Sequence, residues 1–165
     1  MPSAETDDFS DEPTIEERRH DVAPPKTPAA LSKILALWRS FAVGGEIPHR
    51  GQLDMPTLRP WLGHVMIYEA VDGGRDFRNR LEGSEVVMLT GQDWTGRCAS
   101  EVDAQFGSRM LIHMQEAVRT GEPCIHTMWM FQNDALHITR LMMPIKSKED
   151  GPVDQILAVL YPDRT

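Results

Sequence analysis

Histidine and cysteine side chains can bind metal ions, and cysteines can also form disulfides. Their spacing in the chain shows whether either is expected. A zinc site needs His or Cys ligands at short intervals, such as C-x-x-C or two ligands one helical turn apart. His113, His126 and His137 are instead spread over separate predicted elements, and Cys98 and Cys124 stand alone. Two cysteines are also too few for a disulfide framework. The sequence therefore predicts no metal site.

Carboxylates are the next candidates, because paired acids and acid–histidine pairs serve as general acids and bases. Asp54, Asp76 and Glu82 lie where loops and strand ends are predicted, which favours turn and capping roles. The chain has no G-x-S-x-G, no H-E-x-x-H and no phosphate-binding glycine loop with its lysine. An enzyme would have to combine a pocket acid with His113 or His126. That alternative is a small cone-shaped α+β isomerase or dehydratase.

Ten methionines are the compositional oddity of the chain. Thioether side chains are flexible, so they suit ordinary core packing or an adaptable apolar pocket. Arg80 shares a strand face with Arg78 and offers a binding group for an anion or a partner carboxylate. The predicted ligand-binding residues are Arg80, Met88, Trp94, Met110, His113, Met114 and Trp129.

These residues belong to a chain of 165 residues with 41% hydrophobic residues, enough for one domain. The net charge of -8 argues against binding to nucleic acid or to anionic membranes. We find no apolar run long enough for a membrane span and no signal peptide, so a cytoplasmic protein is expected. Residues 1–27 are acidic and rich in proline, which predicts a disordered tail. Removing residues 1–26 is expected to leave the melting temperature almost unchanged.

The remaining residues, 28–165, are predicted to form one α+β domain. An amphipathic helix is expected over 28–43, a short helix over 85–90 and a long helix from Asp103 to Gly121. Strands are expected over residues 64–71, 77–81, 124–132, 136–145 and 153–161. Short links between the strands require antiparallel neighbours, which gives a five-stranded antiparallel sheet. In the last three strands, the side chains on both faces are apolar. Mid-chain helices should therefore cover one face of the sheet and helix 28–43 the other.

Helix 28–43 is also predicted to mediate self-association, because one helix is too narrow to cover the outer face of five strands. The residues expected to pair two copies are Leu31, Leu35, Trp38 and Phe41. Two-fold pairing through one apolar patch would give a homodimer.

The order of elements and several linear motifs resemble the small proteobacterial PAS family that often occurs as stand-alone domains. The matching residues are Trp38, Ile47-Pro48-His49-Arg50, Asp54, Pro56, residues 77–83, residues 91–97 and residues 140–145. The resemblance implies a PAS-like fold, sensory or interaction roles, and dimerisation through the N-terminal helix. It also implies that haem, as in haem-binding relatives, would use His113 on the long helix. A photoactive flavin is rejected, because Cys98 lacks the flanking Asn-Cys-Arg-Phe-Leu-Gln pattern of the light-sensing relatives.

The sequence thus predicts a non-catalytic PAS-type module that binds a small apolar ligand or a signalling partner protein. The rivals are the isomerase-like enzyme and a structural adaptor whose core is filled by its own side chains.

Overall fold

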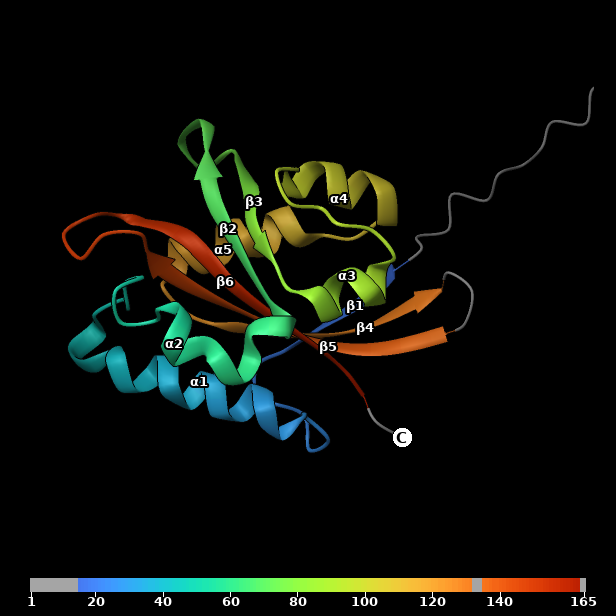
Figure 1. Ribbon diagram of the computed structural model, residues 1–165, viewed down its shortest axis with the longest axis horizontal. Helices are drawn as coiled ribbons and strands as arrows, with labels where there is room; N and C mark the ends of the chain where they lie inside the picture. Colours follow the sequence, from blue (N-terminus) through green and yellow to red (C-terminus); the bar gives the residue numbers. More distant parts are fainter. Residues whose placement is uncertain (1–14, 132–134, 164–165) are drawn as a thin grey trace, which may run out of the picture.

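The fold is built on one antiparallel sheet of six strands, seen in a computed structural model that describes residues 15–131 and 135–163 (Figure 1). The spatial order of the strands is β1-β4-β5-β6-β2-β3. The strands are β1 (Ile15–His20), β2 (Val65–Val71), β3 (Asp76–Glu82), β4 (Cys124–Phe131), β5 (Ala135–Lys146) and β6 (Val153–Pro162). The predicted α+β class, with an antiparallel sheet and helices on both faces, is confirmed.

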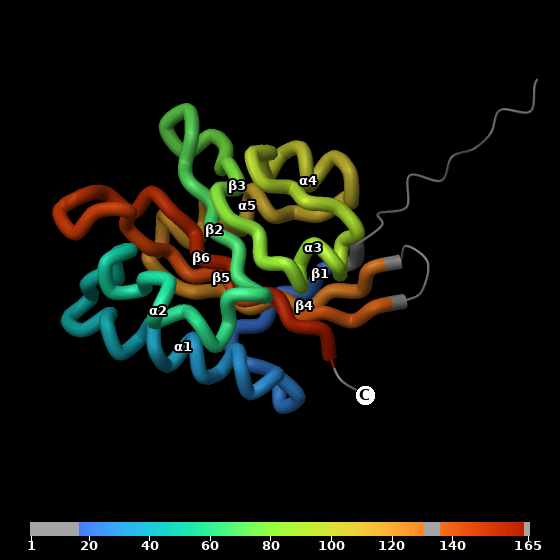
Figure 2. Tube along the Cα trace, viewed as in Figure 1, coloured from blue at the N-terminus to red at the C-terminus, as the bar shows by residue number. Residues whose placement is uncertain are grey.

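Helices cover both faces of the sheet, as the tube trace in Figure 2 also shows. The helices are α1 (Ala29–Phe41), α2 (Met55–Leu58), α3 (Ser84–Thr90), α4 (Ala99–Phe106) and α5 (Met110–Thr120). Short 3₁₀ turns are η1 (Val43–Gly45), η2 (Arg59–His64) and η3 (Asp72–Gly74). Helices α3, α4 and α5 lie on one face, here called the inner face, and α1 and α2 lie on the outer face.

Two hydrophobic cores result, because successive strand residues point to opposite faces. Met128, Met142 and Ile156 belong to the core under α3–α5. Leu141 and Leu157, one position along the same strands, belong to the core under α1. Helix α1 is fixed to the sheet by its own side chains as well. The indole nitrogen of Trp38 donates a hydrogen bond to the Pro144 carbonyl at 2.9 Å.

Strand β1 is a correction to the predicted tail. Residues 15–20 pair antiparallel with β4, from Ile15 opposite Met130 to His20 opposite Ile125, and add a sixth strand at the sheet edge. The segment Ile-Glu-Glu-Arg-Arg-His has no apolar alternation, so its sequence pattern does not identify a strand. What holds it is pairing with β4 and the burial of one carboxylate, that of Glu17. The rest of the predicted tail up to residue 14 lies outside the described residues.

The predicted long helix from Asp103 is two helices, α4 and α5, separated at Gly107. Gly107 has a φ of 68°, a left-handed conformation that favours glycine and ends α4. Asp103 still caps a helix N-terminus, but it lies within α4 and caps the following helix, α5. Its carboxylate accepts the backbone N–H groups of Met110 at 2.8 Å and Leu111 at 3.0 Å.

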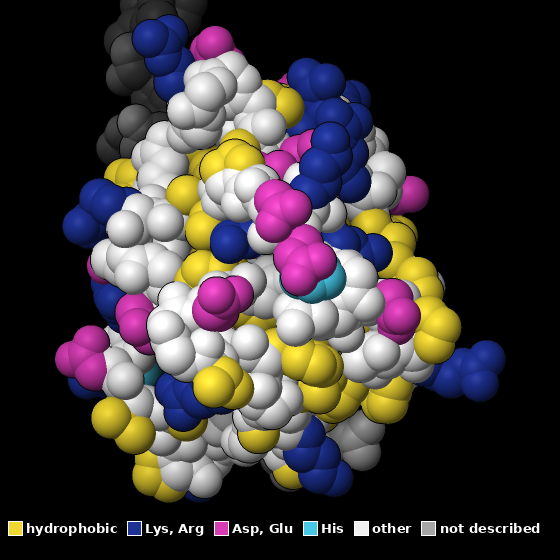
Figure 3. Space-filling view, turned by 90° about the vertical axis from the view of Figure 1, so that its left-hand side faces the viewer, with side chains coloured by type: hydrophobic (Ala, Val, Ile, Leu, Met, Phe, Trp, Pro, Cys, Tyr) yellow, Lys and Arg dark blue, Asp and Glu magenta, His cyan; other side chains and the backbone are white. Residues whose placement is uncertain are grey.

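The surface carries mixed charge. In the face shown in Figure 3, acidic and basic side chains are intermixed, with a group of basic ones at the upper right, and hydrophobic side chains emerge in groups between them. Among the helices of the described residues, none is long and apolar enough to cross a membrane.

Candidate functional site

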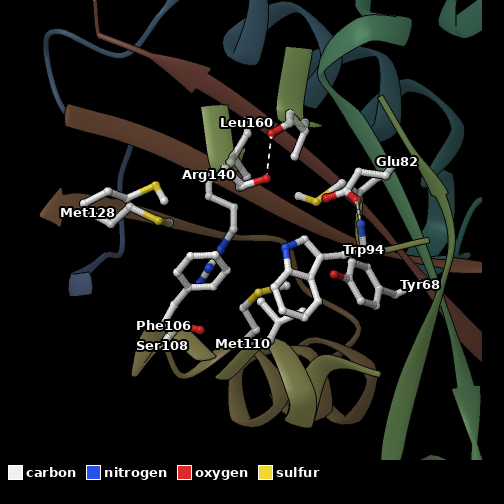
Figure 4. A pocket seen from close by; sticks show the side chains of 14 residues that line it. Tyr68, Glu82, Trp94, Phe106, Ser108, Met110, Met128, Arg140 and Leu160 are labelled. Carbon is white, nitrogen blue, oxygen red and sulfur yellow. Dashed lines mark hydrogen bonds between the residues drawn. The ribbon is translucent and has the colours of Figure 1, made fainter. Parts of the chain in front are cut away.

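A small cavity lies between the inner face of the sheet and helices α3–α5. Its volume is about 40 Å³, more than the roughly 10–15 Å³ that a cavity needs to hold one water molecule. The lining residues are Met66, Tyr68, Glu82, Val86, Thr90, Trp94, Val102, Phe106, Ser108, Met110, Met128, Met130, Arg140 and Leu160 (Figure 4). Four of them are methionines, whose flexible side chains allow the cavity to enlarge around an occupant.

Trp94 forms one wall of the cavity from the loop that follows α3. Its backbone N–H donates to the carboxylate of Glu82 at the end of β3. Its ring meets the edge of Phe106 from α4, with ring centroids 5.7 Å apart. The indole is therefore held by both a strand and a helix.

Glu82 is the carboxyl group among the lining residues. Burial raises its pKa to about 7, an effect that the negative charge of Asp93 reinforces and the Trp94 N–H opposes. Near neutral pH this group exists in both protonated and ionised forms. It can therefore donate or accept a hydrogen bond at the edge of the cavity.

Arg140 is the buried cation of the cavity, with only 2% of its side chain exposed. It lies on β5 between Ile138 and Met142, which are both in the inner core. Its Nη1 donates to Oε1 of Glu17 on β1 at 3.0 Å. A buried guanidinium needs such a partner, because an unpaired buried charge is strongly destabilising.

Glu17 joins Arg140 to His113, which packs against a second histidine outside the cavity. Its Oε2 lies 3.2 Å from Nε2 of His113 on α5, and the ring of His113 lies 3.9 Å from that of His126 on β4. Burial alone would raise the pKa of Glu17, but the His113 hydrogen bond and the Arg140 charge hold it at about 2. Burial and the neighbouring Arg140 charge lower the pKa of His126 to about 3. The cluster is therefore an ionised glutamate between an arginine and a histidine, beside a neutral histidine.

Three buried donor nitrogens of the lining residues have no hydrogen-bond partner within the described part of the chain: Trp94 Nε1, Arg140 Nε and Arg140 Nη2. Figure 4 shows the Trp94 nitrogen turned toward the side on which the Arg140 guanidinium lies. Buried donors normally have an acceptor. These three are donors only, so their missing partner is an acceptor.

The structure brings two of the predicted ligand-binding residues, Trp94 and Met110, into the cavity wall. The others lie elsewhere. Met114 is part of the filled core and His113 faces Glu17. Arg80 is an exposed partner of Glu69 at 2.7 Å.

Met88 and Trp129 are also outside the cavity, for different reasons. Met88 is on the outward side of the short helix α3 and is 76% exposed. Trp129 lies on the outer face of β4, 44% exposed and against the ring of His137.

The sequence does not predict Arg140 or Glu17 as site residues, although their ion pair links the cavity to β1. A signal for Arg140 exists in the sequence, since it is a charged residue at an inward position of an apolar strand. Such a residue is functional or paired in most proteins. Glu17 offers no comparable signal, because its partner lies 123 positions away in the chain.

Haem coordinated through His113 does not fit this structure. Nε2 of His113 is engaged with Glu17, the residue does not line the cavity, and a cavity of about 40 Å³ is far smaller than a macrocycle. Within residues 15–131 and 135–163, no three His, Cys, Asp or Glu side chains converge as metal ligands.

Comparison with solved structures finds the structure of an RNA-binding light-oxygen-voltage receptor. It is 14% identical with a TM-score of 0.49, and the alignment covers 92% of this chain but 39% of that one. No curated protein matches the sequence. The sequence pattern of the PAS domain matches residues 26–161. This match spans α1 to β6, including every helix described above, and the chain therefore belongs to the PAS domain family.

Proposed function

We propose that this PAS domain is a non-catalytic sensory module that binds a small, largely apolar molecule in the cavity between the sheet and α3–α5. The observation that carries the proposal is the combination of methionine-rich walls with unpartnered buried donors on Trp94 and Arg140. Apolar walls with a few placed polar groups are typical of small-molecule sites. A core filled for packing alone has no need of buried N–H groups without acceptors.

The enzyme alternative requires an acid and a histidine at the same cavity. The structure has a partly buried carboxylate–imidazole pair, Glu17 and His113, but neither residue lines the cavity. Among the described residues that do line it, there is a carboxyl group, Glu82, and no histidine. This separation supports binding rather than proton transfer.

A sensory module also needs a route for output, which we propose to be a signalling partner protein. Ligand binding would bias the packing of helices and sheet and thereby alter an exposed surface.

Homodimerisation through α1 stays a proposal, but fewer of the predicted residues are free to contact a second copy. Leu31 and Trp38 are buried against the chain's own sheet, which leaves the half-buried Leu35 and Phe41 for a second copy.

Native mass spectrometry of the protein purified from its own host tests ligand binding. We expect a non-covalent mass on the wild-type chain and its absence in Val102→Trp, which fills the cavity from α4. Val43→Trp, at an exposed position, is the matched control and should retain the mass. A wild-type protein without any bound molecule, or an equal mass on Val102→Trp, would contradict the proposal.

A further inference from the structure

Arg140 belongs to two systems at once, the cavity and the attachment of strand β1. One of its terminal nitrogens, Nη1, is bonded to Glu17. The other terminal nitrogen and Nε have no hydrogen-bond partner within the described residues. These two N–H groups form one edge of the planar guanidinium, the fork that a carboxylate binds with both oxygens.

We propose that the cavity ligand is a small carboxylate, held by the vacant edge of Arg140, and that its binding weakens the grip of Arg140 on Glu17 and loosens strand β1. This inference rests on the proposed function and names the ligand class and the response. The apolar walls would contact a short hydrocarbon or aromatic tail, and Trp94 Nε1 would donate to the same carboxylate. A neutral ligand could accept from the same N–H groups, but it would bring no charge to compete with Glu17 for Arg140.

The coupling follows from charge. Glu17 has 5% of its side chain exposed and Arg140 has 2%, so neither charge is well screened by water. A second carboxylate on Arg140 would place two anions on one buried cation. Like charges sharing a buried site disfavour each other, and one must gain a proton or leave.

Glu17 is the carboxylate that can leave, because it lies on an edge strand. Strand β1 pairs only with β4 among the described strands. Its other side-chain links are the hydrogen bond between Glu17 and His113, the exposed Arg19–Glu116 ion pair, and the hydrogen bond between His20 and Thr127. Exposed ion pairs contribute little, so the buried Glu17 pair is the main side-chain anchor of β1. The resulting signal is exposure of the β4 edge, a surface able to pair with another strand.

Binding is tested by calorimetric titration with acetate, butyrate and benzoate, each compared with its amide of equal shape. We expect at least one carboxylate to bind about tenfold or more tightly than its amide, because two charge-assisted hydrogen bonds to the free guanidinium edge are stronger than bonds to a neutral amide. Trp94→Phe should weaken that carboxylate and keep the preference over the amide. Equal or tighter binding of the amides would overturn the carboxylate class.

The response is tested by hydrogen exchange of residues 15–20 with and without the same carboxylate. In the wild-type chain, the carboxylate should accelerate exchange. In Glu17→Gln, exchange should be fast without the carboxylate, and adding it should change the rate little. By reciprocity, Glu17→Gln should bind the carboxylate about tenfold more tightly, while the exposed Glu149→Gln control should match the wild type. Unchanged or slower exchange of β1 on binding, or unaltered affinity in Glu17→Gln, would overturn the coupling.

Failure of this inference is distinguishable from failure of the proposed function. A neutral molecule on the protein from its host, lost in Val102→Trp, would support a ligand cavity and refute the carboxylate class. Absence of any bound mass together with no binding of the probes would refute both.

Discussion

At the residue scale, the buried histidine His126 ties stability to pH. Its imidazole packs against the ring of His113 and lies opposite Arg140 on the neighbouring strand, and its pKa falls from the ordinary 6.5 to about 3 through burial and the Arg140 charge. The unfolded chain therefore binds a proton more readily than the folded chain between these values. The contribution of neutral His126 to stability is complete above pH 6.5 and is lost as pH falls toward 3.

Replacing His126 with Gln should remove this loss. We expect the difference in free energy of unfolding between wild type and His126→Gln to shift by on the order of 2 kcal/mol from pH 7 to pH 4.5. Urea unfolding at several pH values measures it. The comparison cancels the opposite trend of Glu82, whose raised pKa costs stability as pH rises from 4.5 through 7. A pH-independent difference would contradict the burial of a neutral imidazole.

At the element scale, Asp103 joins α4 to α5. Its carboxylate accepts from the backbone N–H groups of Met110 and Leu111 and from the hydroxyl of Ser108. Asp103→Ala should lower the free energy of unfolding by about 2 kcal/mol, at the upper end for helix caps. The matched control is Asp54→Ala, which removes a cap on the N–H of Thr57 in the four-residue α2. Chemical denaturation of both variants should show the larger loss of unfolding free energy for Asp103→Ala. A smaller loss than for Asp54→Ala would contradict the role of Asp103 in joining α4 to α5.

Strand β1 reverses the prediction from the sequence that removal of residues 1–26 leaves the melting temperature almost unchanged. Removing residues 1–26 takes away Glu17 and leaves Arg140 buried without its counter-charge, a loss of about 3–5 kcal/mol. The melting temperature should therefore fall by about 10 °C. Removing residues 1–14 alone is the control and should change it by a few degrees at most. Calorimetric traces that agree for both truncations would contradict the anchoring role of Glu17.

Most of the elements that the sequence predicts correctly have an apolar pattern; β3, predicted over residues 77–81, is the exception. Strands β2, β4, β5 and β6 and helix α1 bury side chains of their own, so periodicity identifies them and even assigns the faces. Strand β1 is held by a charge pair with a distant residue, which leaves no local pattern. The division of α4 from α5 depends on the left-handed Gly107, which helical periodicity on either side conceals. For the cavity, Trp94 and Met110 were found by residue type, but Arg140 needed the fold.

At the scale of the whole molecule, the sheet is covered on both faces within one chain. Leu31 is 1% exposed and its replacement by Glu would disrupt the outer core. Leu35 is half-buried at the margin of that core, so Leu35→Glu tests self-association with less damage. We predict a dimer for the wild-type chain by light scattering at micromolar concentration and a monomer for Leu35→Glu. A monomeric wild type, or a dimer that Leu35→Glu leaves intact, would contradict pairing through α1.

The proposed ligand site is the space enclosed by Trp94, Met110 and Arg140. A high-resolution crystal structure of the protein purified from its own host tests it most directly. We expect electron density for a non-protein molecule in that space, with an oxygen within hydrogen-bond distance of Nε or Nη2 of Arg140. A cavity that holds only water, or that is closed by the methionine side chains around it, would contradict the proposal.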